Sequence, residues 1–221
     1  MKYVERAGQS SKLKMIKRPA ESAALRQSRL AGTKGLVGVD EVGRGSWAGP
    51  LLVVAARQTG GLPKSLKDSK KMTKQSRLAI FQLLTSNFQF GEGWVQPEEI
   101  DKHGLSYAMR LGVARALIML GADTKAEIII DGNINYCSEQ FKKARAVIKA
   151  DNLHPIVSAA SIYAKVLRDQ HMARIAQFYP KYGFEKHVGY GTKLHRDMLA
   201  KHGVSKIHRI SYKPVIKCIL S

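Results

Sequence analysis

The chain has 221 residues, enough for one α/β core with a small appended segment and too few for two full domains. Its 37 Lys and Arg against 17 Asp and Glu give a formal net charge of +20. An excess this large opposes compactness through self-repulsion, so it indicates a polyanionic partner such as nucleic acid. A solvated basic surface would have the same composition.

Cysteine usage and hydropathy exclude several classes of protein. Cys137 and Cys218 do not form a C-x-x-C pair, so the sequence argues against a disulfide framework and a zinc ribbon and favours a reducing cytoplasm. No apolar run approaches the ~20 residues that a membrane-spanning helix needs, and the basic N-terminus has no apolar signal region. We therefore expect a cytoplasmic protein without a membrane partner, and a monomer by default. An organelle transit peptide stays open, because residues 1–35 are rich in Lys, Arg, Ser and Ala.

In chain order, the first predicted elements are a basic arm and a β-hairpin. Residues 1–35 are rich in Lys and Arg, which predicts a flexible basic extension. Residues 36–40 and 51–55 are β-rich runs on either side of a glycine-rich turn, the pattern of a hairpin. Helical spacing then extends from Thr73, a suitable N-cap, to Leu84.

The middle of the chain alternates between strands and helices. Residues 88–95 are predicted as a strand and residues 105–120 as an amphipathic helix. The apolar run at 127–131 is typical of a strand buried on both faces. A further short strand is expected at 146–149, followed by a long helix at 156–178.

This order of elements predicts an α/β fold, with a mixed central β-sheet flanked by helices. From Lys181 onward the sequence is basic and loop-rich, with one helix near residues 193–202. We expect three parts: the extension at 1–35, a core at 36–178, and a basic helical or loop segment at 179–221 that completes the substrate site.

Four of the scarce acidic residues fall at the ends of strands. Asp40 and Glu41 end the first strand, Asp131 ends the Ile-rich strand, and Asp151 follows the next one. Strand ends converge at one edge of a sheet, so these carboxylates would repel one another unless cations lay between them. Mg²⁺ and Mn²⁺ prefer such oxygen ligands, and a pair of these ions can hydrolyse a phosphodiester.

Other interpretations of the same residues stay open. An Asp at a strand end is most often a turn residue or a helix cap. Adjacent residues of a regular strand face opposite ways, so Asp40 and Glu41 share a site only if the strand ends or bulges there. The following Gly43-Arg44-Gly45 could bring bare backbone close to a 2′-hydroxyl, although a tight hairpin turn is the commoner explanation.

Several segments together resemble the signature of the ribonuclease HII family, in the family's order, from residue 36 to about residue 216. They are Gly38–Gly45 with Ala48–Pro50, Leu66–Lys71, Ile130–Gly132, Lys149–Asp151, Ser158–Ile162, Ala164–Val166 with Arg168-Asp169, Gly189–Thr192 with His195, and His208–Val215. The resemblance implies a ribonuclease H-like fold with a C-terminal helical segment. It implies an endoribonuclease acting on RNA–DNA hybrids and on single ribonucleotides in duplex DNA, leaving 3′-hydroxyl and 5′-phosphate ends.

The resemblance also implies roles for individual residues. The catalytic and metal-binding acids would be Asp40, Glu41, Asp131 and Asp151, with two Mn²⁺ or Mg²⁺ ions per site during catalysis. The 2′-hydroxyl at the cut site would be recognised by Gly43, Arg44 and Gly45. Tyr190 would stack on the neighbouring deoxyribose. The candidates for phosphate contacts are Lys70, Lys71 and Lys165.

Two departures from the family's pattern stand out. Gly104-Leu105 replaces a frequent Asn-Ile pair, which is expected to alter helix capping. The extension is longer than a minimal bacterial member needs and too short for the separate N-terminal domain of ribonuclease HIII.

Two alternatives remain. A catalytically silent binding protein on the same fold would not need all four acids, and another nuclease or strand-transfer enzyme of the broader fold would not need Gly-Arg-Gly or Gly-Tyr-Gly-Thr. A serine or cysteine nucleophile is poorly supported, because most histidines stand in basic surroundings and are expected to be exposed. They are His154, His187, His195, His202 and His208.

Overall fold

The computed structural model describes residues 35–61 and 73–220. The predictions for the extension and for Lys70 and Lys71 therefore lie outside the described residues. In the described part of the chain, no helix is long and apolar enough to cross a membrane.

A five-stranded mixed sheet forms the centre of the fold, in the order β3-β2-β1-β4-β5. Strand β2 (Leu51–Gln58) pairs antiparallel with β1 (Val37–Val42) on one side and with β3 (Phe88–Val95) on the other. The pairing of β1 with β2 confirms the predicted hairpin. Strand β4 (Ile128–Asp131) pairs parallel with both β1 and β5 (Ala144–Val147). The apolar side chains of β4 are buried, as its composition predicts.

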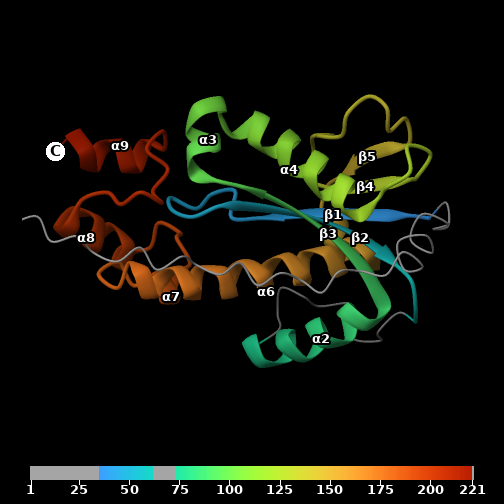
Figure 1. The fold of residues 1–221 in the computed structure, drawn as a ribbon, viewed down its shortest axis with the longest axis horizontal. Helices are drawn as coiled ribbons and strands as arrows, with labels where there is room; N and C mark the ends of the chain where they lie inside the picture. The colour runs from blue at the N-terminus through green and yellow to red at the C-terminus, as the bar shows by residue number, and fades with distance from the viewer. Residues whose placement is uncertain (1–34, 62–72, 221) are drawn as a thin grey trace, which may run out of the picture. The chain divides into compact units, whose positions relative to one another are not determined.

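Helices cover both faces of the sheet (Figure 1). Helix α4 (Leu105–Leu120) packs on one face, where alternate residues of β1 and β2 enter its core. Helices α6 (Pro155–Phe178) and α2 (Lys74–Asn87) cover the other face. The Thr73 hydroxyl accepts a 3.1 Å hydrogen bond from the Ser76 amide at the start of α2, so the predicted N-cap is confirmed.

Close packing of α6 on the sheet depends on a glycine in β1. A Cβ added at Gly38 would lie 2.6 Å from the Ile156 carbonyl carbon, well inside van der Waals contact. Gly38 therefore lets the start of α6 approach the backbone of β1. As a result, the residues of β1 that share this face with Gly38 lie directly beneath α6.

The structure differs from the predictions in several short elements. The strand predicted at 146–149 lies at 144–147, and Lys149 has a left-handed backbone with φ of 59°. Asp151 therefore belongs to the first turn of a short helix, α5 (Ala150–Leu153), instead of following a strand. Three helices follow Lys181 where one was expected: α7 (Phe184–His187), α8 (Lys193–His202) and α9 (Lys213–Leu220).

Helix α3 (Pro97–His103) was also not predicted. Gly104, with φ of 80°, both ends α3 and precedes α4. Gly104 therefore occupies a helix cap, and the effect of its departure from the family's Asn stays a prediction.

Candidate active site

The four acidic residues lie on neighbouring elements: Asp40 and Glu41 within β1, Asp131 at the end of β4, and Asp151 in α5. Asp40 is only 7% exposed, and its Oδ1 accepts a 2.8 Å hydrogen bond from the Glu41 amide. Asp131 is the last residue of β4, and its Oδ1 accepts a 2.7 Å hydrogen bond from the amide of Ala150. Asp131 thus holds the start of α5, which carries the buried Asp151.

Asp40 and Glu41 lie on opposite faces of one regular strand. β1 continues in unbroken register to Val42, with Asp40 opposite Val54 and Glu41 opposite Val53. The prediction that β1 ends or bulges at these residues is therefore wrong, and the two side chains point to opposite faces of the sheet. Asp40 faces α6, where the Ser161 side chain hydrogen-bonds to it. The Glu41 carboxylate lies 3.6 Å from an Arg44 guanidinium nitrogen.

The carboxylates nevertheless interact electrostatically across this edge of the sheet. Burial raises the pKa of Asp40 well above its usual range, and the charges of Glu41 and Asp131 raise it further. Burial also raises the pKa of Glu41, and Asp131 adds to this effect while Arg44 opposes it. Ionised acids in this arrangement repel one another, which a cation bound nearby would relieve.

The donor set suits a hard divalent cation whose coordination the protein completes only in part. Among residues 35–61 and 73–220, no three His, Cys, Asp or Glu side chains gather closely enough to hold one ion. Mg²⁺ usually keeps several waters and binds through one or two carboxylates together with substrate phosphates. Carboxylates that repel one another, spread along one edge of a sheet, fit an ion of this kind.

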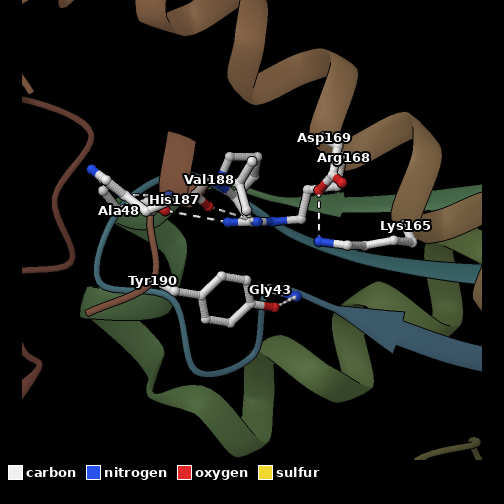
Figure 2. A network of polar contacts seen from close by, with 10 residues as sticks. Gly43, Ala48, Lys165, Arg168, Asp169, His187, Val188 and Tyr190 are labelled. Carbon is white, nitrogen blue, oxygen red and sulfur yellow. Dashed lines mark hydrogen bonds and ion pairs between the residues drawn. The ribbon is translucent and has the colours of Figure 1, made fainter. Parts of the chain in front are cut away.

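A second group of residues joins the glycine-rich turn to the segment around Tyr190. The Gly43 amide donates a 3.2 Å hydrogen bond to the Tyr190 hydroxyl, although 147 residues separate them in sequence. The amides of Trp47 and Ala48 donate to the Gly189 carbonyl at 2.8 and 3.3 Å. Figure 2 shows the Tyr190 ring with its hydroxyl directed at Gly43. The structure therefore brings two of the predicted substrate-binding segments together.

Arg168, from α6, is fully buried against both segments (Figure 2). Its guanidinium donates to the carbonyls of Pro50 and Val188, each at 2.9 Å, and of Ala48 at 3.3 Å. It also lies 5.6 Å from the centre of the Tyr190 ring. Burial lowers the pKa of Arg168 to about 10, so this arginine remains charged at neutral pH. The three carbonyls and the ring surround that charge.

A second fully buried arginine, Arg209, binds the same turn from its other side. Its Nε and Nη2 donate to the Gly49 carbonyl at 3.0 and 2.9 Å, and its Nη1 donates to the Arg44 carbonyl at 3.0 Å. The Tyr212 hydroxyl donates to the same Arg44 carbonyl at 2.6 Å. Residues 43–50 are thus held at their backbone by two arginines, while Arg44 and Gly45 remain exposed.

Sequence reasoning assigned no role to either arginine. Arg168 lies four residues from Ala164 and from Met172, both buried. A charged residue on this apolar face of the helix could have indicated that Arg168 is buried. Arg209 lies between helices and offers no such periodicity.

The remaining predicted residues have mixed outcomes. The Lys165 ammonium donates to Asp169 at 2.8 Å and lies 6.0 Å from the Tyr190 ring centre, so this candidate is close to the site. The expected exposure of the histidines is wrong for three of them. His187, His195 and His208 are 6%, 0% and 2% exposed, because aromatic rings rather than solvent surround them.

Two glycines of the turn should respond differently to alanine. Gly43 has φ of +86°, and an added Cβ would lie 2.2 Å from Arg168 Nε, whereas nothing lies within 4 Å of a Cβ at Gly45. We expect Gly43→Ala to lower the unfolding free energy by about 1–3 kcal/mol from backbone strain alone. Gly45→Ala should leave it nearly unchanged. Denaturant unfolding compares the two, and equal stabilities would contradict the left-handed backbone described for Gly43.

Comparisons with known proteins agree with this geometry. The ribonuclease HII family model matches residues 37–215. The chain is 41% identical to ribonuclease HII of Sphingopyxis alaskensis over 180 residues, covering 81% of this chain and 89% of that protein. It is 39% identical to ribonuclease HII of a Marinomonas species over 186 residues, covering 83% and 92%.

Solved structures show the same fold. Ribonuclease HII of Archaeoglobus fulgidus, solved in a complex with PCNA, has a TM-score of 0.70 at 25% identity. Ribonuclease H2 of Pyrococcus horikoshii has a TM-score of 0.65 at 26% identity. Each alignment covers 83% of this chain and 96% of the other. The predicted ribonuclease H-like fold is confirmed, and the chain belongs to the ribonuclease HII family of metal-dependent ribonucleases.

Proposed function

We propose that this enzyme cuts RNA in RNA–DNA hybrids and also cuts at single ribonucleotides embedded in duplex DNA. Hydrolysis would break the O3′–P bond on the 5′ side of a ribonucleotide, with the water oxygen joining phosphorus, to leave 3′-hydroxyl and 5′-phosphate ends. The main support for the single-ribonucleotide activity is the hydrogen bond between Gly43 and Tyr190, because it places the two predicted substrate-binding segments side by side. The net charge of +20 suits a nucleic-acid duplex as the partner.

Four acids would hold the divalent ions, Mg²⁺ or Mn²⁺, two per site during catalysis: Asp40, Glu41, Asp131 and Asp151. Bound there, such ions activate a water and stabilise the leaving oxygen. The protein orients the acids through its own contacts. Ser161 hydrogen-bonds to Asp40, and Asp131 accepts from the amide that begins α5. Arg44 partly balances the charge of Glu41.

The turn at Gly43–Gly45 would recognise the ribose. A 2′-hydroxyl both donates and accepts hydrogen bonds, and the exposed backbone of Arg44 and Gly45 offers partners of both kinds. Tyr190, held at its hydroxyl by Gly43, would present its ring to the neighbouring deoxyribose. Segment 179–221 would complete the substrate site, because it supplies both Tyr190 and the Arg209 that holds the turn.

Lys165 would contact a backbone phosphate close to Tyr190. The ion pair between Lys165 and Asp169 is partly exposed and therefore weak. Replacing Asp169 by a substrate phosphate as the partner of Lys165 would thus cost little free energy.

Electrostatics favours an enzyme over a silent binding protein. Raised carboxyl pKa values at one edge of a sheet are unfavourable for the folded state and are typical of functional sites. A protein that only bound duplexes through its basic surface would gain nothing from keeping acids this close together, two of them buried.

Two substitutions of Tyr190 test the single-ribonucleotide activity. Removing an aromatic ring that stacks on nucleic acid loses about 1–3 kcal/mol, or roughly 5- to 150-fold. We therefore expect Tyr190→Ala to lower kcat/KM by about that factor on DNA with one ribonucleotide, and much less on a uniform hybrid. Tyr190→Phe keeps the ring but removes the hydroxyl that accepts from Gly43, so it should show a smaller fall that measures the hydrogen bond apart from stacking. An equal fall on both substrates would remove this role from Tyr190.

A further inference from the structure

Two buried histidines from different parts of the C-terminal segment meet directly behind Tyr190. His195 lies in the first turn of α8, and His208 follows α8 in a bridge with Ala48. Their Nε2 atoms are 3.1 Å apart. His195 Nδ1 lies 3.0 Å from the Tyr190 carbonyl oxygen, and His208 Nδ1 lies 2.8 Å from the Ser205 amide. A continuous chain of contacts therefore connects Ser205 to the backbone of Tyr190.

The two ends of this chain fix the direction of each hydrogen bond. The Ser205 amide can only donate, so His208 Nδ1 accepts from it and from the Ser205 hydroxyl, also 2.8 Å away, and the single proton of the neutral ring must lie on Nε2. His208 Nε2 then donates to His195 Nε2, which leaves the His195 proton on Nδ1. That proton is donated to the Tyr190 carbonyl, which can only accept. Both rings must be neutral, because a second proton would place two N–H groups face to face.

The segment that these bonds hold has a strained backbone. Val188 has φ of +45° and Gly189 has φ of +87°, so a β-branched residue occupies the left-handed region just before Tyr190. Such conformations persist only where surrounding contacts determine them. Arg168 binds the Val188 carbonyl, and the Gly189 amide donates to His187 Nδ1 at 3.3 Å. The bond from His195 supplies the next contact along the segment.

We propose that His195 and His208 are positioning residues, and that their directed hydrogen bonds fix the backbone of Tyr190 so that its ring meets the sugar beside a single ribonucleotide. This inference rests on the role proposed for Tyr190. Both histidines are buried, so neither side chain can reach a bound duplex. Their effect should therefore appear in the choice between substrates more than in hydrolysis itself.

The surroundings of the pair favour neutral rings. Burial lowers the pKa of His195 and of His208 to about 4 each, and each is lowered further by neighbouring imidazoles. The rings packed around the pair are Trp47, Tyr182, Phe184 and His187. At neutral pH both imidazoles therefore keep the protonation that the hydrogen bonds require.

Two substitutions of His195 separate positioning from packing. In His195→Asn the amide nitrogen can take the place of Nδ1 and still donate to Tyr190. In His195→Gln the amide reaches the place of Nε2, near His208, and leaves the Tyr190 carbonyl without this donor. We expect His195→Gln to lower kcat/KM on single-ribonucleotide DNA about tenfold more than His195→Asn does, a loss equivalent to one hydrogen bond. On a uniform hybrid the two variants should differ little.

The alternative is that His195 only fills the core. Both variants would then lose activity on both substrates in step with their loss of thermal stability, and that result would overturn the proposal. Tyr190→Ala, assayed beside them, tests the underlying function separately. If Tyr190→Ala leaves the ratio of kcat/KM on the two substrates unchanged, the role proposed for Tyr190 is wrong. The measured tautomers of His195 and His208 then test the hydrogen-bond directions independently of that role.

The tautomers can be measured without any substrate. Long-range ¹H–¹⁵N spectra of the wild-type protein at neutral pH should show His195 protonated at Nδ1 and His208 protonated at Nε2. The opposite tautomer at either ring, or a doubly protonated ring, would overturn the inference whatever the activities of the variants.

Discussion

Asp40→Asn is expected to lower cleavage of an RNA–DNA hybrid by at least about a thousandfold while raising the unfolding free energy by roughly 1–2 kcal/mol. An asparagine keeps the oxygen that accepts from the Glu41 amide, so the local structure should persist. It removes the charge that would hold a divalent cation, and with it the repulsion from Glu41 and Asp131. Activity and stability therefore change in opposite directions.

The gain in stability should depend on pH. Since the pKa of Asp40 is raised, the folded state takes up this proton at a higher pH than the unfolded state does. The ionised carboxylate thus destabilises the folded protein above the raised pKa, and this effect disappears as the pH falls below it. Thermal unfolding in EDTA should show the largest advantage of Asp40→Asn at neutral pH, shrinking on acidification. The exposed Glu139→Gln is the control and should show no such gain.

Metal binding gives a second measure that does not depend on activity. A ligand that binds only the folded state stabilises it by about 2.7 kcal/mol at 100 times its Kd. Mg²⁺ or Mn²⁺ should therefore raise the unfolding temperature of the wild-type protein and have little effect on Asp40→Asn. An equal rise in both would show that the ion binds elsewhere.

Arg168→Met should destabilise the protein by about 3 kcal/mol or more, because three buried carbonyls lose a charged donor at once. Two of these carbonyls, at Ala48 and Pro50, belong to the turn that precedes β2, and the third, at Val188, precedes Tyr190. We expect the surviving folded protein to cut single ribonucleotides poorly. Arg168→Lys should recover only part of the loss, since an ammonium lacks the planar fork of the guanidinium.

The control for this substitution is Arg145→Met. Arg145 is 54% exposed and pairs with Glu127 at 3.2 Å, so its loss should change the unfolding free energy by less than about 1 kcal/mol. Denaturant unfolding measures both variants. Similar stabilities for Arg168→Met and Arg145→Met would show that the buried arginine does not hold the two segments together.

The long elements of the fold could be predicted because their patterns repeat. The bounds of β3 and α4 match the prediction, since eight and sixteen residues give several periods of alternation or helical spacing. Helices α3, α5 and α7 have seven residues or fewer and offer too little periodicity to detect. The strand predicted at 146–149 was displaced because Lys149 adopts a left-handed turn that its residue type does not indicate.

The acidic residues of the candidate site could be predicted from the sequence, whereas the buried residues that hold the substrate-binding segments in place could not. Asp131 ends β4, and the parallel pairing of β1 with β4 places Asp40 near it, so their proximity follows from the order of the strands. The buried roles of Arg168 and His208 depend on partners far away in sequence, such as Pro50, 118 residues from Arg168. A basic, loop-rich composition predicts exposure, and only the tertiary structure shows that aromatic rings and backbone carbonyls enclose these residues.

The most direct test is cleavage of a DNA duplex that carries one ribonucleotide, with Mg²⁺ or Mn²⁺ present. EDTA and Asp40→Asn are the controls. We expect metal-dependent cleavage on the 5′ side of that ribonucleotide, leaving a 3′-hydroxyl, in the wild-type protein alone. Cleavage confined to long hybrids would contradict the roles of Gly43 and Tyr190. Binding of the duplex without cleavage in either metal would contradict the assignment of the four acids as a catalytic site.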